Sequence, residues 1–188
     1  MRYTAEHKAQ TRERLLNEAG ALAKDAGFAV TGVDALMKRI GLSGAAFYSH
    51  FDSKEALFAE LIERELDSSL LMVGAAPGAN GREQLQATLK RYLSLAHVEH
   101  PDKGCVLPTL GVEVARASET VREQTQQQLQ QVVDNWGQIL GDTELAWAVL
   151  AQCLGSLLLA RMLATRSAQE QVLQASHQLL SQHLPADA

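Results

Sequence analysis

The stretch SGAAFYSHF, residues 43–51, gathers hydroxyl, phenol and imidazole groups and contains no Lys, Arg, Asp or Glu. Such side chains donate hydrogen bonds to phosphate oxygens and read base edges in a DNA groove. Their spacing is that of a short helix built to enter such a groove. The chemistry that this stretch indicates is therefore recognition of a nucleic acid, with the charge supplied from elsewhere in the chain.

The sequence contains no comparable set of residues for catalysis. The sequence contains no Ser/His/Asp set with a nucleophile elbow, no glycine-rich phosphate loop and no HExxH motif. Its two cysteines, Cys105 and Cys153, have neither the number nor the spacing of a disulfide framework or a zinc cluster. We therefore expect no enzyme activity, no metal and no cofactor, and we interpret both thiols as small buried hydrophobic groups in a reducing compartment.

The charge of the chain is unevenly distributed. The 188 residues carry a formal net charge of −5, but residues 1–54 hold eight Lys and Arg against six Asp and Glu, and the remainder holds nine against sixteen. This asymmetry is typical of an N-terminal part that approaches a polyanion. The N-terminus, MRYTAEHKAQTRERLL, does not resemble a signal peptide, and no uncharged apolar stretch of about 18 residues occurs, so we expect a cytoplasmic protein without a membrane span.

Three helices are predicted in the N-terminal part. A first helix runs from near Thr4 to Ala26, and Thr31 is the expected N-cap of a short second helix. Gly41 ends that helix in a left-handed conformation, and Ser43 caps a third helix that ends about Phe51. A helix, a three-residue turn with glycine and a second capped helix form the helix-turn-helix unit, whose second helix lies in the major groove.

The rest of the sequence predicts longer helices. Asp52 followed by Glu55 resembles a capping box, with Ser53 as a competing cap, for a helix that continues to Leu70. We interpret GAAPGANG, residues 74–81, as a connector within a helical body. The expected fold is all-α, with about nine helices and no strand. A helix-turn-helix DNA-binding domain is expected over residues 1–52, followed by a helical ligand-binding and dimerisation domain over residues 53–188.

A family pattern covers the predicted helix-turn-helix. The segment TGVDALMKRIGLSGAAFYSHFDSKEALFAELI resembles the DNA-binding domain of TetR-family transcriptional regulators, in which an aromatic-Tyr-x-His/Tyr-Phe run precedes a Lys-Glu-x-Leu helix start. The resemblance covers roughly residues 8–62, and beyond it only the number and lengths of the helices are similar. It implies a homodimer that places two recognition helices in successive major grooves, and a C-terminal domain whose small-molecule occupancy changes their separation.

The resemblance also implies roles for single residues. Four positions match phosphate contacts of the family pattern: Thr31, Tyr48, His50 and Lys54. Base contacts then fall to four residues at the start and outer side of the recognition helix: Ser43, Gly44, Ala45 and Ser49. Four further cations are either phosphate-neutralising or solvated surface charges: Lys8, Arg12, Lys38 and Arg39.

Two residues depart from the family pattern. Many relatives carry Arg or another long polar side chain where this sequence has Gly44, and a bidentate Arg-to-guanine contact is worth about 1–3 kcal/mol of discrimination. We therefore expect modest direct readout and a larger share from DNA shape and symmetry. Met37 stands where the motif usually has a small residue, and its flexible side chain is expected to fit with some adjustment of packing.

The C-terminal part is expected to hold the dimer interface and the ligand. Two helices at about 143–164 and 167–184 would pair with their symmetry mates as a four-helix bundle that buries Gly155. The candidates for a ligand pocket, with plain core as the alternative for each, are Tyr92, Cys105, Leu107, Trp136 and Trp147. Cys105 precedes a helix start, where the dipole and nearby Lys103 would lower the thiol pKa, so it is either a redox sensor or a plain buried thiol. We interpret His97 and His100 as solvated and not as metal ligands.

These observations predict a ligand-responsive transcriptional regulator. Its simplest form is a repressor that binds a palindromic operator as a dimer and is released by a small-molecule inducer. Two alternatives remain open: a repressor that senses oxidants or electrophiles through Cys105, and, from another class, a helical adaptor that binds proteins and not DNA. A DNA affinity that falls steeply with salt concentration would separate the regulator from the adaptor.

Overall fold

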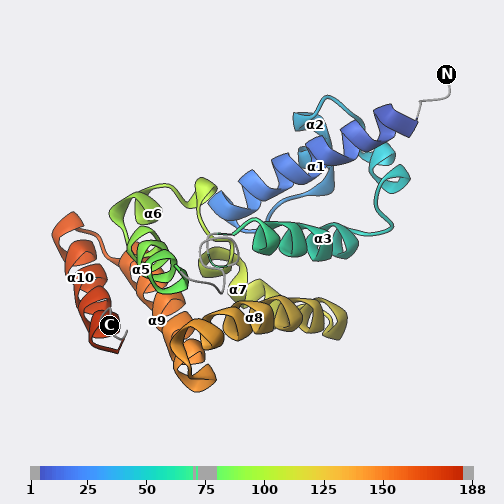
Figure 1. The fold of residues 1–188 in the computed structure, drawn as a ribbon. Helices are drawn as coiled ribbons and strands as arrows, with labels where there is room; N and C mark the ends of the chain where they lie inside the picture. Colours follow the sequence, from blue (N-terminus) through green and yellow to red (C-terminus); the bar gives the residue numbers. More distant parts are fainter. Residues whose placement is uncertain (1–4, 70, 72–79, 184–188) are drawn as a thin grey trace.

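The described structure consists of helices joined by turns and short loops (Figure 1). The computed structural model describes residues 5–69, 71 and 80–183. Within these ranges it contains nine α-helices, two short 3-10 helices (η) and no strand, which confirms the all-α prediction. The elements are α1 (Ala5–Ala26), α2 (Val33–Arg39), η1 (Gly44–Ser49), α3 (Lys54–Asp67), α5 (Gly81–Tyr92), α6 (Leu95–Glu99), η2 (Pro101–Lys103), α7 (Leu107–Ala115), α8 (Glu119–Leu140), α9 (Thr143–Met162) and α10 (Arg166–His183).

The first three elements, α1, α2 and η1, form a unit that we call the head. α2 packs against both α1 and η1, and the apolar side chains between them are buried. Met37 is fully buried, so its large side chain is accommodated at the helix crossing. Gly41 has a φ of 80°, in the left-handed region where glycine meets no Cβ penalty, as predicted for the end of the second helix.

Two predicted helix caps are wrong. The N-cap of α2 is Gly32 and not Thr31, because the Thr31 hydroxyl points back to α1 and donates to the Gly27 carbonyl at 3.0 Å. The N-cap of α3 is Ser53, the competing cap, whose Oγ accepts from the Ala56 N–H at 3.0 Å. Its extended backbone lets the side chain reach that free amide, so Asp52 is not the cap.

The recognition element is shorter than predicted. Ser43 stands at its N-cap position without a side-chain cap bond, and the element is a 3-10 helix that ends at Ser49 and not near Phe51. The hydrogen bonds from the N–H of Ala46 to the Ser43 carbonyl and from the N–H of His50 to the Phe47 carbonyl close 3-10 turns at both ends.

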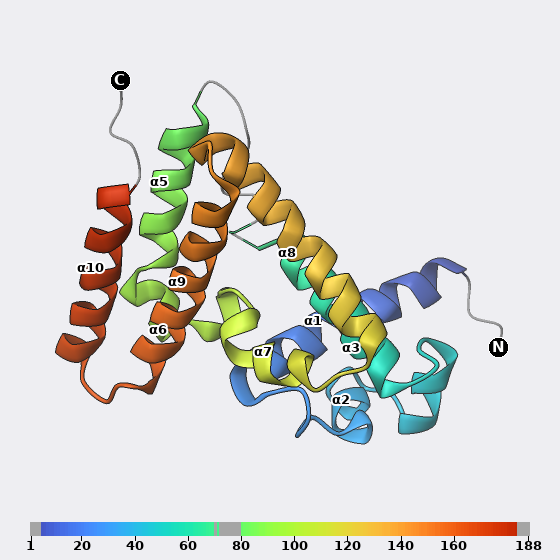
Figure 2. The same cartoon turned by 90° about the horizontal axis from the view of Figure 1, so that it is seen from below.

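The elements from α5 to α10 form the body. α9 lies at its centre and contacts α5, α6, α7, α8 and α10. α8 runs alongside α3 (Figure 2), and α3 packs against α1, so α3 joins the body to the head. Gly81, the last residue of the predicted connector, begins α5, whereas residues 74–79 and the predicted helix ends at Thr4 and Leu70 lie outside the described residues.

α9 is the one described helix that is long and apolar enough to cross a membrane by length and composition alone. Such a helix is weak evidence for a membrane span, because the core helix of a globular protein has the same composition. α9 packs against five neighbouring helices. This packing explains its apolar sequence, because a helix that is apolar all round must be covered on several sides.

Candidate nucleic-acid interface

Aromatic side chains form the platform under η1. Phe47 is fully buried, and its ring stacks on Phe51 at a centroid distance of 5.7 Å and meets Tyr48 edge-on at 5.3 Å. Tyr48 is 67% exposed, so its ring packs on the scaffold while much of the side chain faces solvent. A tyrosine held in this way can donate its phenol O–H to a phosphate oxygen without distorting the fold.

The residues predicted to face bases lie mostly on the open side of η1. Ser43, Ala45 and Ser49 are exposed, and the Ser49 hydroxyl donates to the Ala46 carbonyl at 2.7 Å. Gly44 is half-buried against the first turn of α2, where a Cβ added to it would collide with Oδ1 of Asp34. The absent side chain thus permits a close approach of α2 and η1, and it leaves the Asp34 carboxylate at the start of the recognition element.

Two of the predicted phosphate contacts are engaged inside the protein. The Lys54 Nζ donates to the Ala29 carbonyl at 2.9 Å and lies 4.9 Å from the centre of the Phe28 ring. Thr31 is 9% exposed, and its one hydroxyl proton is used in the bond to the Gly27 carbonyl. An ammonium group has three donors, so Lys54 retains donors for a phosphate, whereas the Thr31 side chain has none to spare.

His50 follows η1 and lies in a positive environment. Burial lowers the pKa of His50, and the nearby charges of Lys8, Arg12 and His7 lower it further. The Nδ1 atom of His50 is buried and makes no hydrogen bond within the described part of the chain. A phosphate at this point would meet a donor-capable ring surrounded by cations.

The other predicted cations differ in how they are held. Arg12 pairs with Glu60 and lies over the ring of Phe51, 4.4 Å from its centre. Arg39 pairs with Glu18 at 3.2 Å. The side chains of the remaining two predicted cations make no ion pair or hydrogen bond with another described residue: Lys8 and Lys38.

Glu113 of α7 ties the body to the head. Its two carboxylate oxygens accept from the backbone N–H groups of Phe28 and Ala29, at 2.9 and 2.7 Å, in the turn between α1 and α2. A second link joins α3, where Glu55 accepts from the N–H of Ser118 at 3.2 Å. Glu113 is not among the residues that the sequence predicts to be functional, although it is the only charged residue in the helix LPTLGVEVA.

The predicted pocket residues do not all come together. Tyr92, Cys105, Leu107 and Trp136 are buried in the core, whereas Trp147 is 40% exposed on α9. Tyr92 and Cys105 are neighbours, because each influences the pKa of the other. The structure therefore joins these two residues and leaves Trp147 at the surface.

The environment of Cys105 differs from the prediction. Burial raises the pKa of the thiol and outweighs the lowering by Tyr92, the Leu107 backbone, Arg161 and Lys24, so the expected activation is wrong for this conformation. His97 is buried and not solvated, and its Nε2 accepts from the Cys105 N–H at 2.9 Å while Nδ1 bonds to the Tyr92 carbonyl at 2.8 Å. Burial lowers the pKa of His97, and these two bonds fix the neutral ring with the proton on Nδ1.

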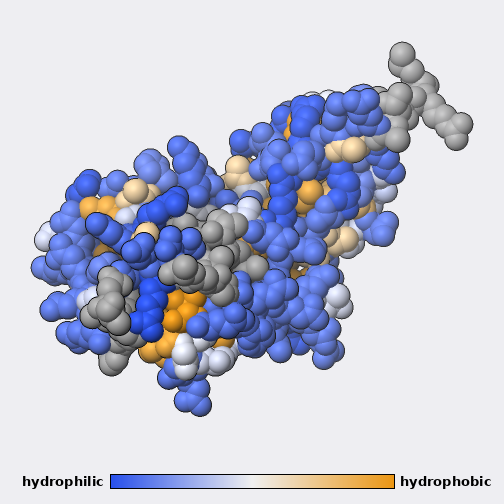
Figure 3. Space-filling model, viewed as in Figure 1, coloured by the Kyte–Doolittle hydropathy of each residue, from blue (hydrophilic) through white to orange (hydrophobic). Residues whose placement is uncertain are grey.

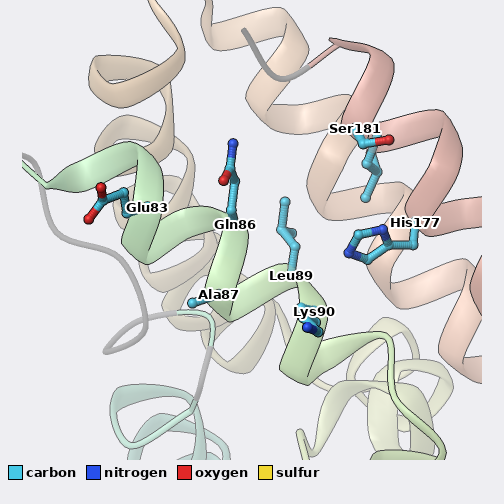
Figure 4. Close-up of a pocket in the computed structure, with 8 residues that line it drawn as sticks. Glu83, Gln86, Ala87, Leu89, Lys90, His177 and Ser181 are labelled. Carbon is cyan, nitrogen blue, oxygen red and sulfur yellow. The ribbon is translucent and has the colours of Figure 1, made fainter. Parts of the chain in front are cut away.

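Two of the cavities at the surface involve the body and bear on ligand binding. The first, of about 450 Å³, is a groove between α5 and α10, where Leu89 and His177 face each other (Figure 4). The second, of about 640 Å³, lies between head and body, and its wall includes Lys24 of α1, Glu65 of α3 and Cys105. We call this second space the junction cavity. Among the described residues, no cluster of three or more His, Cys, Asp or Glu is placed to hold a metal ion.

Comparisons with known proteins agree with this architecture. A family model described as "Bacterial regulatory proteins, tetR family" matches residues 15–61. The HTH-type transcriptional activator FasR of Mycolicibacterium smegmatis is 28% identical over 97 residues, which cover 50% of this chain and 43% of FasR. The chain thus spans less than half the length of this curated relative.

Solved structures match over nearly the whole chain. E. coli NemR in its reduced form is 23% identical, with a TM-score of 0.75, over 95% of this chain and all of that one. A TetR transcriptional regulator from Legionella pneumophila is 20% identical, with a TM-score of 0.70, over 98% of this chain and all of that one. At these identities the likeness concerns the fold, while the family match covers the helix-turn-helix. Residues 15–61 thus match the DNA-binding part of the TetR family of bacterial regulatory proteins, and the chain as a whole has the fold of solved TetR-family regulators.

Proposed function

We propose that the protein is a homodimeric repressor that binds a palindromic DNA operator and releases it when a small molecule binds to the body. The observation that carries this proposal is the pair of hydrogen bonds that the Glu113 carboxylate accepts from the turn between α1 and α2. Because a residue of the body holds the turn that leads into the helix-turn-helix, a shift of α7 would move α2 and η1 with it.

The proposed DNA contacts divide into two groups. Bases face Ser43, Gly44, Ala45 and Ser49 at η1, and phosphates meet Tyr48, His50, Lys54 and the start of α2 beside Thr31. The division between the DNA-binding domain, residues 1–52, and the ligand-binding domain, residues 53–188, falls at the start of α3. That helix packs against both α1 and α8, so it is well placed to transmit movement between them.

The proposed dimer interface lies on α9 and α10. Large apolar side chains are exposed there, and hydrophobic surface gathers over α9 beside α10 (Figure 3). Gly155 on α9 is exposed, and no atom of another segment lies within 4 Å of the place that a Cβ would take, so this face is open to a close approach. The exposed apolar residues of the two helices are Trp147, Leu158, Leu159, Met162 and Leu179.

A second candidate function is sensing of oxidants or electrophiles through Cys105. One observation favours it: Cys105 belongs to the wall of the junction cavity, so a movement that exposed its buried thiol would bring the thiol into contact with a reagent held there. Alkylation should then release DNA from the wild type and not from Cys105→Ser. An equal response of the Ser variant would exclude the sensor.

The test of the main proposal starts with the DNA upstream of the gene. Footprinting should show a partial palindrome, and the affinity should fall steeply with salt because bound phosphates release counterions. A helical adaptor would show neither. Size-exclusion chromatography with light scattering should give a dimer. Since FasR is an activator, a reporter assay in cells decides the sign of control, and activation by this protein would contradict the repressor.

A further inference from the structure

The junction cavity is built from both parts of the molecule. Lys24 at the C-terminal end of α1 and Glu65 on α3 form one side, while the ends of α5 and α6 and the segment around η2 form the other. Its volume of about 640 Å³ lies in the range of sites that hold small organic molecules. A molecule bound there would touch the head and the body at once.

The charge of the cavity wall is opposite to that of the surrounding chain. After residue 54 the sequence has nine Lys and Arg against sixteen Asp and Glu. Three of those nine cations line the cavity, Lys90, Arg91 and Lys103, together with Lys24 from the head. Among the described residues, Glu65 is the one carboxylate in the wall. The cavity therefore concentrates positive charge within an acidic region.

The cations of the wall are mostly uncompensated. Lys24 pairs with Glu65 at 2.6 Å, and Nζ also donates to the Asp102 carbonyl at 3.2 Å. Lys90, Arg91 and Lys103 make no ion pair or side-chain hydrogen bond with any residue that the structure describes. Three cations around one cavity repel each other and gain when an anion enters.

The back of the cavity adds to this field. Arg161 of α9 donates to the His97 carbonyl at 3.0 Å and to Oγ1 of Thr109 at 3.2 Å, directly behind Gly104. His97 and Cys105 in the same wall are buried, at 9% and 4% exposure. Arg161 and Lys24 each lower the pKa of both groups, so their positive charge is felt at the back wall.

We propose that the junction cavity binds a small organic anion with an apolar body and a carboxylate, sulfonate or phosphate group. The anionic group pairs with Arg91 and Lys103 at the mouth and competes with Glu65 for Lys24. Because Lys24 lies two residues before the end of α1, its release from Glu65 acts on the turn that Glu113 holds. The regulatory part of this inference rests on the proposed function, whereas binding of the anion does not.

The experiment uses two fluorescent probes that share an aromatic body. 8-Anilinonaphthalene-1-sulfonate carries the anionic group, and N-phenyl-1-naphthylamine lacks it. In titrations of the full chain, Arg91→Gln and Lys103→Gln should each weaken binding of the sulfonate about threefold and leave the neutral probe unaffected. Glu65→Gln should strengthen sulfonate binding, because it removes the competing carboxylate. Arg122→Gln on α8, an exposed cation outside the cavity, is the control with the same charge change.

The possible results distinguish binding of the anion in the cavity from its effect on operator binding. If Arg91→Gln and Lys103→Gln bind the sulfonate as the wild type does, or if Arg122→Gln weakens it equally, the anion site is wrong and the repressor proposal is unaffected. If the sulfonate binds with the expected charge dependence and operator affinity does not change, the site is correct and release through this cavity is wrong. Inorganic phosphate as competitor shows whether the anionic group alone is sufficient, and full displacement at low millimolar phosphate would contradict the need for an apolar body.

Discussion

The two surfaces of this molecule that attract anions, the face of η1 and the junction cavity, hold their cations in different ways. At the proposed DNA face, Arg12 and Arg39 are paired with carboxylates and Lys54 is bonded to a backbone carbonyl, which leaves Lys8 and Lys38 without such partners among the described residues. In the cavity, Lys24 is paired with Glu65, whereas Lys90, Arg91 and Lys103 have no such partners among the described residues. The number of cations in a segment therefore does not show how much charge it offers.

The difference fits the two ligands. DNA presents a regular row of phosphates, so a few well-oriented donors on a rigid platform are sufficient to set the register. A small anion has one or two charges, so affinity must come from several cations that meet at one point. The head provides rigidity through Phe47 and Phe51, and the cavity provides charge.

The largest expected effect concerns the platform. Phe47→Ala removes a fully buried ring that contacts both Phe51 and Tyr48, and it should cost about 3–5 kcal/mol of unfolding free energy in chemical denaturation. Tyr48→Ala is the matched control, because the Tyr48 ring is 67% exposed and its loss should cost much less. Equal losses for the two variants would show that the buried ring does not hold η1.

Local patterns predict the head well. The left-handed backbone of Gly41 follows from turn chemistry, which acts over a few residues, and this prediction is confirmed. The caps at Thr31 and Asp52 are wrong, since the Thr31 hydroxyl bonds to the Gly27 carbonyl and leaves the cap position to Gly32, and the extended backbone of Ser53 lets its side chain cap α3. The recognition element, predicted as a helix to about Phe51, is a short 3-10 helix.

Contacts between distant segments could not be predicted from the sequence. Glu113 meets Phe28 and Ala29 across about 85 residues of chain, and no local pattern carries that pairing. The sequence indicates a solvated His97 because its actual partners are backbone groups of Tyr92 and Cys105, which have no side-chain signature. The junction cavity likewise joins cations from separate helices.

The second prediction tests the link between the two regions. Glu113→Ala leaves the N–H groups of Phe28 and Ala29 without their acceptor, which should cost about 1–3 kcal/mol and speed hydrogen exchange of those two amides. Glu123→Ala on α8 removes an exposed carboxylate that forms no ion pair with another described residue, so it should change neither. Unchanged exchange at Phe28 and Ala29 in the first variant would contradict the link.

The third prediction compares how two cations affect operator binding: Lys54 at the DNA face and Arg91 in the junction cavity. Lys54→Ala should weaken operator binding and reduce the slope of log affinity against log salt by about 0.9 for each phosphate that is no longer neutralised. Lys54→Arg keeps the charge and should keep the slope. Arg91→Gln, in the junction cavity, should leave both affinity and slope unchanged without an added anion. A slope that falls in Arg91→Gln would place the cavity cations on the DNA.

The smallest expected effect is a pH dependence of operator affinity. It should come from His50 at the DNA face and not from His97 in the cavity wall. Burial and nearby cations lower the pKa of His50, and burial lowers that of His97. A phosphate beside His50 would raise its pKa, so DNA binding would take up a proton, and affinity should rise modestly as pH falls from about 7.5 to 6, around the ordinary histidine value. His50→Gln should flatten that dependence, whereas His97→Gln should not.

Stability of the free protein should change with pH in the opposite direction. Because the folded-state pKa of both histidines lies below the unfolded value, the unfolded chain binds more protons, and unfolding free energy should fall as pH drops below about 6.5. Denaturation of the free protein would then show contributions from both residues, while operator titrations would show that of His50 alone. If His97→Gln flattened the operator titration as well, the neutral His97 ring would be coupled to the DNA face, and the two regions could no longer be treated as independent anion sites.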